Sequence, residues 1–306
     1  MASLVKFVRY LRLKIIVSLF RLAVRLFSKS APPKPDSVLR IPSRDTGRTI
    51  KAHLYKPSGD DTRNGRPYPV LINFCGSGFA LHLHGLDDPF CRFVAANTGY
   101  TVLDIEYRLG PEHPFPAAVN DVEDAIKYVL DRPAEYKASH LSVSGFSSGG
   151  TLALVAPTLF PPGTLQSVIA FYPATDLASD PSLRKPPAPN AKPRSVVMTK
   201  LFRKGYIGDM DPRDPRISPA YANTNSYPQR MLVVTAELDS SALEAEELAE
   251  RAKTESVASG REVVLRRMKG CGHAFDKRNK DQACASARDE AYGLAVDMLR
   301  KITSQH

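Results

Sequence analysis

The sequence has few cysteines, and they form no recognisable framework. Its four cysteines, Cys75, Cys91, Cys271 and Cys284, show no C-x-x-C spacing, so neither a zinc ribbon nor a small disulfide-bonded scaffold is predicted. We expect free thiols in a reducing compartment. Cys271 lies two residues before His273 but has no companion ligand pair, so we predict no metal site and no cofactor.

Acidic residues are missing from two segments. The first 35 residues carry eight Lys and Arg, residues 181–208 carry seven, and neither segment has an acid. The net charge of +10 is therefore concentrated in these segments, and the rest of the chain is mildly acidic. Because no recognised nucleic-acid module accompanies this charge, we do not expect nucleic-acid binding.

Residues 1–29 are predicted to form one long cationic helix without a membrane-spanning run. The longest uncharged run there is residues 15–20, far short of the ~18 residues that span a bilayer. No small-x-small cleavage site follows, so we expect an intracellular protein that is not secreted. Helical periodicity puts polar and basic residues on one face, namely Lys14, Ser18, Arg21, Arg25 and Lys29.

Such a helix is typical of a peripheral membrane interface, with its apolar side in the acyl boundary and its cations on anionic lipid. Two alternatives stay open: a helix that packs on the body as part of a lid, and a transit peptide. The Pro-rich residues 31–35 then separate residues 1–35 from the body, residues 36–306.

The body alternates strands with helices, which predicts an α/β fold with a mostly parallel sheet flanked by helices. Two short strands, near 37–42 and 48–56, and a loop around Asn64 and Gly65 come first. Further strands are expected at 69–75, 100–107, 140–145, 167–172, 230–236 and 262–268, and helices at 86–97, 117–130, 148–159, 240–258 and 285–303. An insertion at about 177–228 has no core strand, and we expect it to form a helical cap.

A Gly-x-Ser-x-Gly pattern at Gly145, Ser147 and Gly149 joins a predicted strand to a predicted helix. This context is typical of a nucleophile elbow, in which a sharp turn exposes the serine hydroxyl and glycines permit close strand–helix packing. The pattern alone is weak evidence, since a glycine-rich turn with a solvated serine has the same letters. The case for catalysis therefore depends on the rest of the chain.

A serine nucleophile needs a base, and the base needs an acid that fixes its tautomer. In α/β-hydrolases the chain order is serine, acid, histidine. Asp239 and His273 each follow a predicted strand in that order, and the only other histidine after Asp239 is the terminal His306. We therefore predict Asp239 as the acid and His273 as the general base.

Three other carboxylates are alternatives for the acid. Asp176, Glu237 and Asp276 all lie in loops after predicted strands. Asp176 is more typical of a cap or turn residue, and the other two lie one step away from the expected position.

The oxyanion of an acyl-transfer intermediate needs backbone N–H donors. One comes from the residue after the nucleophile, Ser148, and others come from the turn at residues 75–79, where small residues permit close approach to a substrate.

Residues 106–118, EYRLGPEHPFPAA, resemble the D-Y-R-L-A-P-E-x-P-F-P-A-A motif of the hormone-sensitive-lipase-like carboxylesterases, the α/β-hydrolase fold-3 group that includes arylacetamide deacetylase. The resemblance also covers the family's H-G-G-G-[FW] motif at 75–79 and its G-D-S-A-G-G motif at 145–150, and it extends over roughly residues 37–300. It implies an α/β-hydrolase fold with a cap built from the N-terminal segment and the insertion.

The resemblance also implies roles for individual residues. Ser147, Asp239 and His273 would be nucleophile, acid and base. The oxyanion hole would be formed by the amides of Ser77, Gly78 and Ser148. Separately from the resemblance, we expect Phe79 and Phe146 to contact the substrate.

Four positions depart from the family pattern. Cys75 replaces a histidine, Ser77 a glycine, Phe146 the aspartate before the nucleophile, and Glu106 the aspartate of the D-Y-R motif. None removes a member of the triad, so they bear on substrate range and rate more than on reaction type.

The leading hypothesis is a cofactor-free serine carboxylesterase that acts on small to medium apolar esters through an acyl-enzyme on Ser147. One alternative is a dehydratase or lyase that uses the same triad for acid–base chemistry. Another is a ligand receptor on the same fold, against which the presence of His273 argues, because such receptors lack a working histidine.

Overall fold

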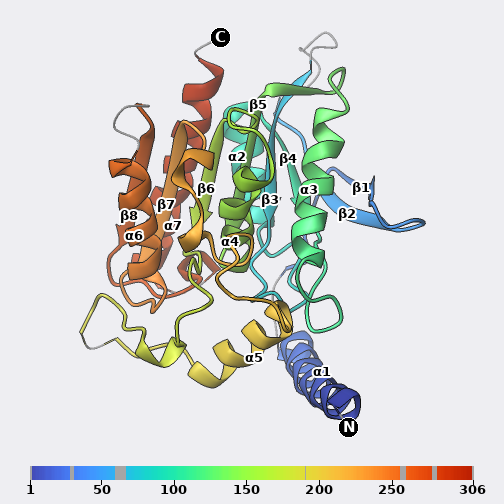
Figure 1. Ribbon diagram of the computed structural model, residues 1–306. Coiled ribbons are helices and arrows are strands. Elements are labelled where there is room, and N and C mark those ends of the chain that lie inside the picture. Colours follow the sequence, from blue (N-terminus) through green and yellow to red (C-terminus); the bar gives the residue numbers. More distant parts are fainter. Residues whose placement is uncertain are drawn as a thin grey trace.

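An eight-stranded sheet runs through the centre of the molecule in the computed structural model, which describes residues 2–27, 31–58, 67–189, 191–255, 260–277 and 281–304 (Figure 1). The strand order is β1-β2-β4-β3-β5-β6-β7-β8. Strands β1 (Ser37–Pro42) and β2 (Thr49–Tyr55) are antiparallel to their neighbours. The others are parallel: β3 (Tyr68–Phe74), β4 (Thr101–Ile105), β5 (Tyr136–Phe146), β6 (Ser167–Phe171), β7 (Arg230–Ala236) and β8 (Glu262–Met268).

Helices cover both faces of the sheet, and each face has its own apolar core. Helices α2 (Asp88–Thr98) and α7 (Gln282–Thr303) pack together on one face. Helices α3 (Ala117–Leu130), α4 (Ser148–Val155) and α6 (Ala242–Thr254) lie on the other (Figure 1). Short 3-10 helices occupy Ala156–Leu159, Pro181–Leu183, Pro219–Tyr221, Thr224–Ser226 and Phe275–Lys277. Because both faces are covered, the central strands are almost entirely buried apolar runs.

The predicted alternation of strands and helices is confirmed, and the differences lie at element ends. Strand β5 begins at Tyr136, four residues before the predicted start at 140. The helix predicted at 148–159 changes to a 3-10 turn at Ala156, where Pro157 cannot donate a helical hydrogen bond. The loop around Asn64 and Gly65, the basic residue Lys29 and the last predicted residues of helix 240–258 lie outside the described residues.

Two further helices meet at the carboxyl end of the parallel strands, α1 (Ala2–Phe27) and α5 (Val196–Ile207) (Figure 1). They touch through Phe20 and Phe202, whose ring centroids are 6.4 Å apart in an edge-to-face arrangement. Between residues 177 and 228, the described residues contain α5 and three of the 3-10 helices and no strand.

Helix α1 holds to the body by a few contacts. Val17 is fully buried, and the guanidinium of Arg21 makes a two-pronged pair with Glu112, with both N–O distances at 3.0 Å. Arg21 also donates to the carbonyls of Ala80 and Gly110. Arg21 therefore faces the body, and not an anionic lipid surface as expected for the basic face of a membrane-interface helix. No helix in the described part of the chain combines the length and the apolar character that crossing a bilayer requires.

Candidate active site

Ser147 occupies a sharp turn between β5 and α4. Its φ of 52° and ψ of −116° put it in a region that L-residues rarely adopt. The turn is held by the Ser147 N–H donating to Phe171 O at 2.9 Å. A Cβ at Gly145 would lie 2.1 Å from Gly149 O, and one at Gly149 would lie 1.8 Å from Phe74 O. The elbow geometry therefore requires both glycines, as the pattern predicted.

The turn brings together three residues that are far apart in the sequence. The Oγ of Ser147 lies 2.8 Å from Nε2 of His273, and Nδ1 of the same ring lies 2.6 Å from Oδ2 of Asp239. Asp239 follows β7 and His273 follows β8, so both lie at the carboxyl edge of the sheet. The serine and the imidazole remain partly exposed, whereas Asp239 is buried.

The environment of Asp239 keeps it ionised. Burial opposes ionisation, but the imidazole of His273, its hydrogen bond and the nearby Arg194 together hold the pKa of Asp239 below its ordinary value. The N–H of Ser241 also donates to Oδ1 at 3.1 Å. An ionised, hydrogen-bonded carboxylate can orient the ring and stabilise its protonated form.

The three alternative acids lie elsewhere. Oδ1 of Asp176 accepts the N–H groups of Ala178 and Ser179, the arrangement of a turn residue. Glu237 accepts the N–H of Gly270, and Asp276 is buried between Tyr172 and Tyr292, whose hydroxyls donate to it. Within the described residues, none of the three makes a hydrogen bond or an ion pair with His273.

The loop opposite Ser147 is held by hydroxyl groups. The hydroxyl of Tyr107 donates to Cys75 O at 2.7 Å, and the hydroxyls of Ser77 and Ser148 lie 2.8 and 3.1 Å from the same phenolic oxygen. The Ser77 oxygen in turn accepts the N–H of Phe79 at 3.0 Å. A buried hydroxyl network therefore positions the loop where the related motif has a histidine and three glycines.

The predicted oxyanion amides differ in whether their N–H groups already donate a hydrogen bond. The N–H of Ser77 donates to the hydroxyl of Ser148 at 2.9 Å. Within the described residues, no hydrogen bond from the amides of Gly78 or Ser148 is found. The loop approaches the elbow closely, since a Cβ at Gly76 would lie 3.0 Å from Phe146 O.

Phe146 does not have the placement expected of a substrate contact. It is 1% exposed, stacks on Phe171 at 4.4 Å between centroids, and has the Nζ of Lys277 4.2 Å from its ring centroid. Since the side chain before the nucleophile points into the core that α2 and α7 cover, its role is packing. This corrects the prediction that Phe146 contacts the substrate.

Phe79 joins the loop to the cap. Its ring stacks on Tyr206 of α5 at 3.7 Å between centroids, and its backbone has φ of 60°. Gly78 lies under the same helix, because a Cβ there would lie 2.9 Å from the ring of Phe202. Helix α5 therefore packs directly on the predicted oxyanion loop.

Sequence reasoning missed the contributions of Tyr107 and of the Ser148 hydroxyl. Tyr107 belongs to the 106–118 motif, so its position in a long motif was the available signal. The hydroxyl of Ser148 gave no signal, because its partner Ser77 is remote in the sequence. One group in the described residues has metal-ligand atoms together, namely His53, His84 and Asp104; it involves β2 and β4 rather than the strands that carry the triad.

Comparison with known proteins gives a consistent result. A family model for the alpha/beta hydrolase fold matches residues 71–277. Carboxylic ester hydrolase LipN of Mycobacterium tuberculosis is 31% identical over 251 residues, covering 74% of this chain and 61% of that protein. Esterase LipI of the same organism is 32% identical over 155 residues, covering 48% of this chain and 47% of LipI. The matches thus span less than two thirds of the length of these relatives.

A solved structure of similar shape is the hyperthermophilic esterase from Pyrobaculum calidifontis. It superposes with a TM-score of 0.77 at 27% identity, covering 95% of this chain and 94% of the esterase. The overall fold of this chain is therefore similar to that of a solved esterase over nearly the full length of both chains.

Proposed function

The chain belongs to the alpha/beta hydrolase fold family, and from this premise we propose that it is a serine carboxylesterase. The observation that carries the proposal is the relay from Ser147 Oγ through His273 to Asp239, with contacts of 2.8 and 2.6 Å. Relatives named as ester hydrolases support the reaction class. A receptor on this fold would not need such a relay.

In the proposed reaction, Nε2 of His273 takes the proton of Ser147 as Oγ attacks the ester carbonyl carbon. The protonated imidazole, stabilised by Asp239, then gives this proton to the leaving alkoxide as the C–O bond breaks. Water activated by the same imidazole hydrolyses the acyl-enzyme, which releases the acid and restores Ser147.

The oxyanion formed in each half-reaction would be stabilised by the amides of Gly78 and Ser148, which have no acceptor in the described residues. The Ser77 amide is the third donor of the proposed hole. It can take part only when the Ser148 hydroxyl gives up its 2.9 Å hydrogen bond.

The proposed substrates are small to medium esters with apolar acyl groups. A panel of p-nitrophenyl esters graded by acyl length measures this preference directly.

A fluorophosphonate probe tests the reaction class. We expect the chain to be labelled, and Ser147→Ala to abolish both labelling and p-nitrophenyl acetate hydrolysis. Labelling that survives the substitution would overturn the proposal. A dehydratase or lyase would give products without the elements of water added, which mass spectrometry distinguishes.

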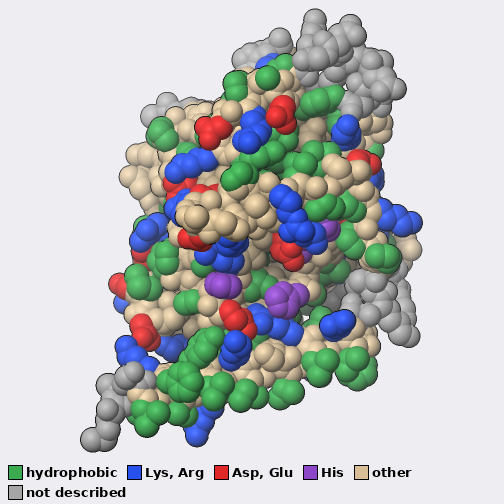
Figure 2. Space-filling view, turned by 90° about the vertical axis from the view of Figure 1, so that its right-hand side faces the viewer, with side chains coloured by type: hydrophobic (Ala, Val, Ile, Leu, Met, Phe, Trp, Pro, Cys, Tyr) green, Lys and Arg blue, Asp and Glu red, His purple; other side chains and the backbone are tan. Residues whose placement is uncertain are grey.

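We also propose that α1 binds an anionic membrane surface. Large apolar side chains along the helix are exposed, among them Leu4, Phe7, Leu11, Leu19 and Leu26. In Figure 2, hydrophobic side chains gather along the lower edge of the molecule with Lys and Arg among them. An acid-free amphipathic helix with apolar groups in solvent fits a lipid interface.

Co-sedimentation with phosphatidylserine vesicles tests the membrane proposal. We expect binding by the full chain, and its loss in a variant with Leu4→Ser, Phe7→Ser and Leu11→Ser. Vesicles of phosphatidylcholine alone serve as the charge control. Equal sedimentation of the variant would show that the apolar side of α1 has no part in binding.

A further inference from the structure

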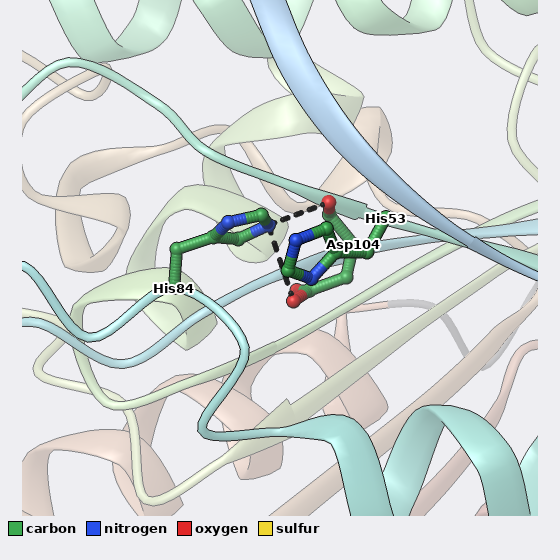
Figure 3. Close-up of side chains that lie close together, drawn as sticks. All are labelled: His53, His84 and Asp104. Atoms are coloured by element: carbon green, nitrogen blue, oxygen red, sulfur yellow. Dashed lines mark hydrogen bonds and ion pairs between the residues drawn. The ribbon is translucent and has the colours of Figure 1, made fainter. Parts of the chain in front are cut away.

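Two imidazoles and a carboxylate meet at the edge of the sheet away from the triad strands. His53 of β2 faces Asp104 of β4 in the antiparallel register, so their side chains share one face of the sheet. His84 reaches the same point from the segment between β3 and α2 (Figure 3). Three separate segments therefore supply one compact group.

The ligand-type atoms of this group lie close together. One nitrogen of each imidazole and one carboxylate oxygen lie within 4.8 Å of one another. Nε2 of His84 lies 3.4 Å from Oδ2 of Asp104 and 2.9 Å from the Asp104 carbonyl oxygen, and the two imidazole centroids are 4.0 Å apart. Ligands of a tetrahedral zinc ion at ~2.0–2.2 Å lie about 3.4 Å apart, which is the observed separation of Nε2 of His84 and Oδ2 of Asp104.

The polar atoms of this group are short of partners. Nδ1 of His53 and Nδ1 of His84 are buried and have no hydrogen bond among the described residues. Oδ2 of Asp104 has no hydrogen bond there either, and Nε2 of His84 lies 3.4 Å from it. Buried polar atoms without partners are costly, and a bound cation would satisfy them.

Supporting groups and an entry path are also present. Asn73 donates to Oδ1 of Asp104 at 2.8 Å, which orients the carboxylate. Nε2 of His84 donates to the Asp104 carbonyl oxygen at 2.9 Å, so it binds a metal only after this bond breaks and the ring proton moves to Nδ1, where Glu106 lies 4.0 Å away. His84 also lines a pocket of about 430 Å³.

We propose that His53, His84 and Asp104 bind one divalent transition-metal ion such as zinc. Two imidazole nitrogens and one carboxylate oxygen form a ligand set that zinc uses, and solvent from the pocket supplies the fourth ligand. The site is separate from Ser147 and takes no part in the ester chemistry. It ties β2 to β4 and to the segment before α2.

The bound ion would act on stability through these elements. Asp104 connects through Asn73 to Ser144, whose hydroxyl donates to Asn73 at 2.8 Å, so β3, β4 and β5 are linked. An ion that binds the folded chain but not the unfolded chain raises the stability of the protein by mass action. The alternative is a buried His84–Asp104 charge pair that needs no ion.

Titration of the chelator-stripped full chain with Zn²⁺ and Co²⁺ tests the proposal. Calorimetry should give one ion per chain, Zn²⁺ should raise the melting temperature, and Co²⁺ should show the visible absorption of a four-coordinate ion. Because His273 could also bind zinc, the titration is repeated in His273→Gln, where binding should persist.

Variants locate the site. His84→Gln should weaken Zn²⁺ binding by at least about tenfold, whereas His82→Gln, an exposed histidine two residues away, should leave it unchanged. Asp104→Asn, which can retain the partner Asn73, provides a second ligand variant if His84→Gln does not fold. No binding to the wild-type chain, or binding unchanged by both ligand variants, would overturn the proposal.

Discussion

At the residue scale, Tyr107 connects the two sides of the loop opposite Ser147. It is buried, and its hydroxyl contacts Cys75, Ser77 and Ser148. The phenol of Tyr107 therefore contacts both sides of the proposed oxyanion hole. In the motif that this loop resembles, a histidine and glycines stand at these positions.

Tyr107→Phe removes this anchor while keeping the ring. We expect kcat for p-nitrophenyl acetate to fall about tenfold, and the free energy of unfolding to fall by about 1–3 kcal/mol because Cys75 O loses its buried donor. Tyr100→Phe, the same change at the other end of β4, is the matched control and should leave kcat unchanged. An unchanged kcat in Tyr107→Phe would contradict the assigned role.

Phe146 can be separated from the chemistry by its effect on stability. Phe146→Ala should lower the free energy of unfolding by about 3–5 kcal/mol, because it removes a ring packed among Phe90 and Phe171. Urea unfolding measures this loss. The KM of the folded fraction should not change; a raised KM with normal stability would return Phe146 to substrate binding.

The lowered pKa of His53 predicts that the free energy of unfolding depends on pH. Its pKa is about 4 in the folded chain and about 6.5 when unfolded. The unfolded chain therefore binds the extra proton between these values, so the stability contribution is lost as pH falls from 6.5 to 4.

His53→Gln should remove that contribution. In chelator, the urea midpoint of the wild-type chain should fall more between pH 7 and pH 5 than that of His53→Gln. Equal losses in the two proteins would show that the ring is not kept neutral by its surroundings.

At the element scale, the turn between β5 and α4 has no room for a side chain at Gly149, the last residue of the Gly-x-Ser-x-Gly pattern. Gly149→Ala should abolish hydrolysis and soluble folded protein, since its Cβ would lie 1.8 Å from Phe74 O. Gly293→Ala is the control, because it lies inside α7 and nothing is within 4 Å of the new Cβ. This variant should fold, and its free energy of unfolding should rise by about 0.5–1 kcal/mol. Normal activity of Gly149→Ala would contradict the close packing of this turn.

The sequence predicted these elements well because their signals are local. Strands β7 and β8 and helix α3 have the predicted bounds, and each is a strong apolar or amphipathic run. The orientation of Arg21 could not be predicted from helical periodicity, since its partner Glu112 lies in another part of the chain. For the same reason Phe146 could be placed beside Ser147 but not assigned to the core.

The His53, His84 and Asp104 group shows the same limit. Only the register of β2 against β4 puts His53 opposite Asp104, and no spacing in the sequence encodes that register. The order Ser147, Asp239, His273 was predictable because parallel strands deliver their carboxyl ends to one edge.

At the scale of the whole molecule, the basic residues and the catalytic residues are concentrated in different parts of the chain. The mildly acidic body carries the triad, whereas basic residues concentrate in α1 and the cap. Arg194 of the cap lies close enough to help lower the pKa of Asp239, and Arg203 donates to the carbonyls of Leu177 and Ser179. Some cap cations are therefore structural, and so is Arg21 of α1, which pairs with Glu112.

The acyl-enzyme on Ser147 is the most direct test of the account. A reaction with p-nitrophenyl acetate, quenched in acid within the first turnover, should give one acetyl group on the peptide that carries Ser147 by mass spectrometry. Ser147→Ala should give none. An acetyl group on another residue during turnover, or hydrolysis by Ser147→Ala at the wild-type rate, would contradict it.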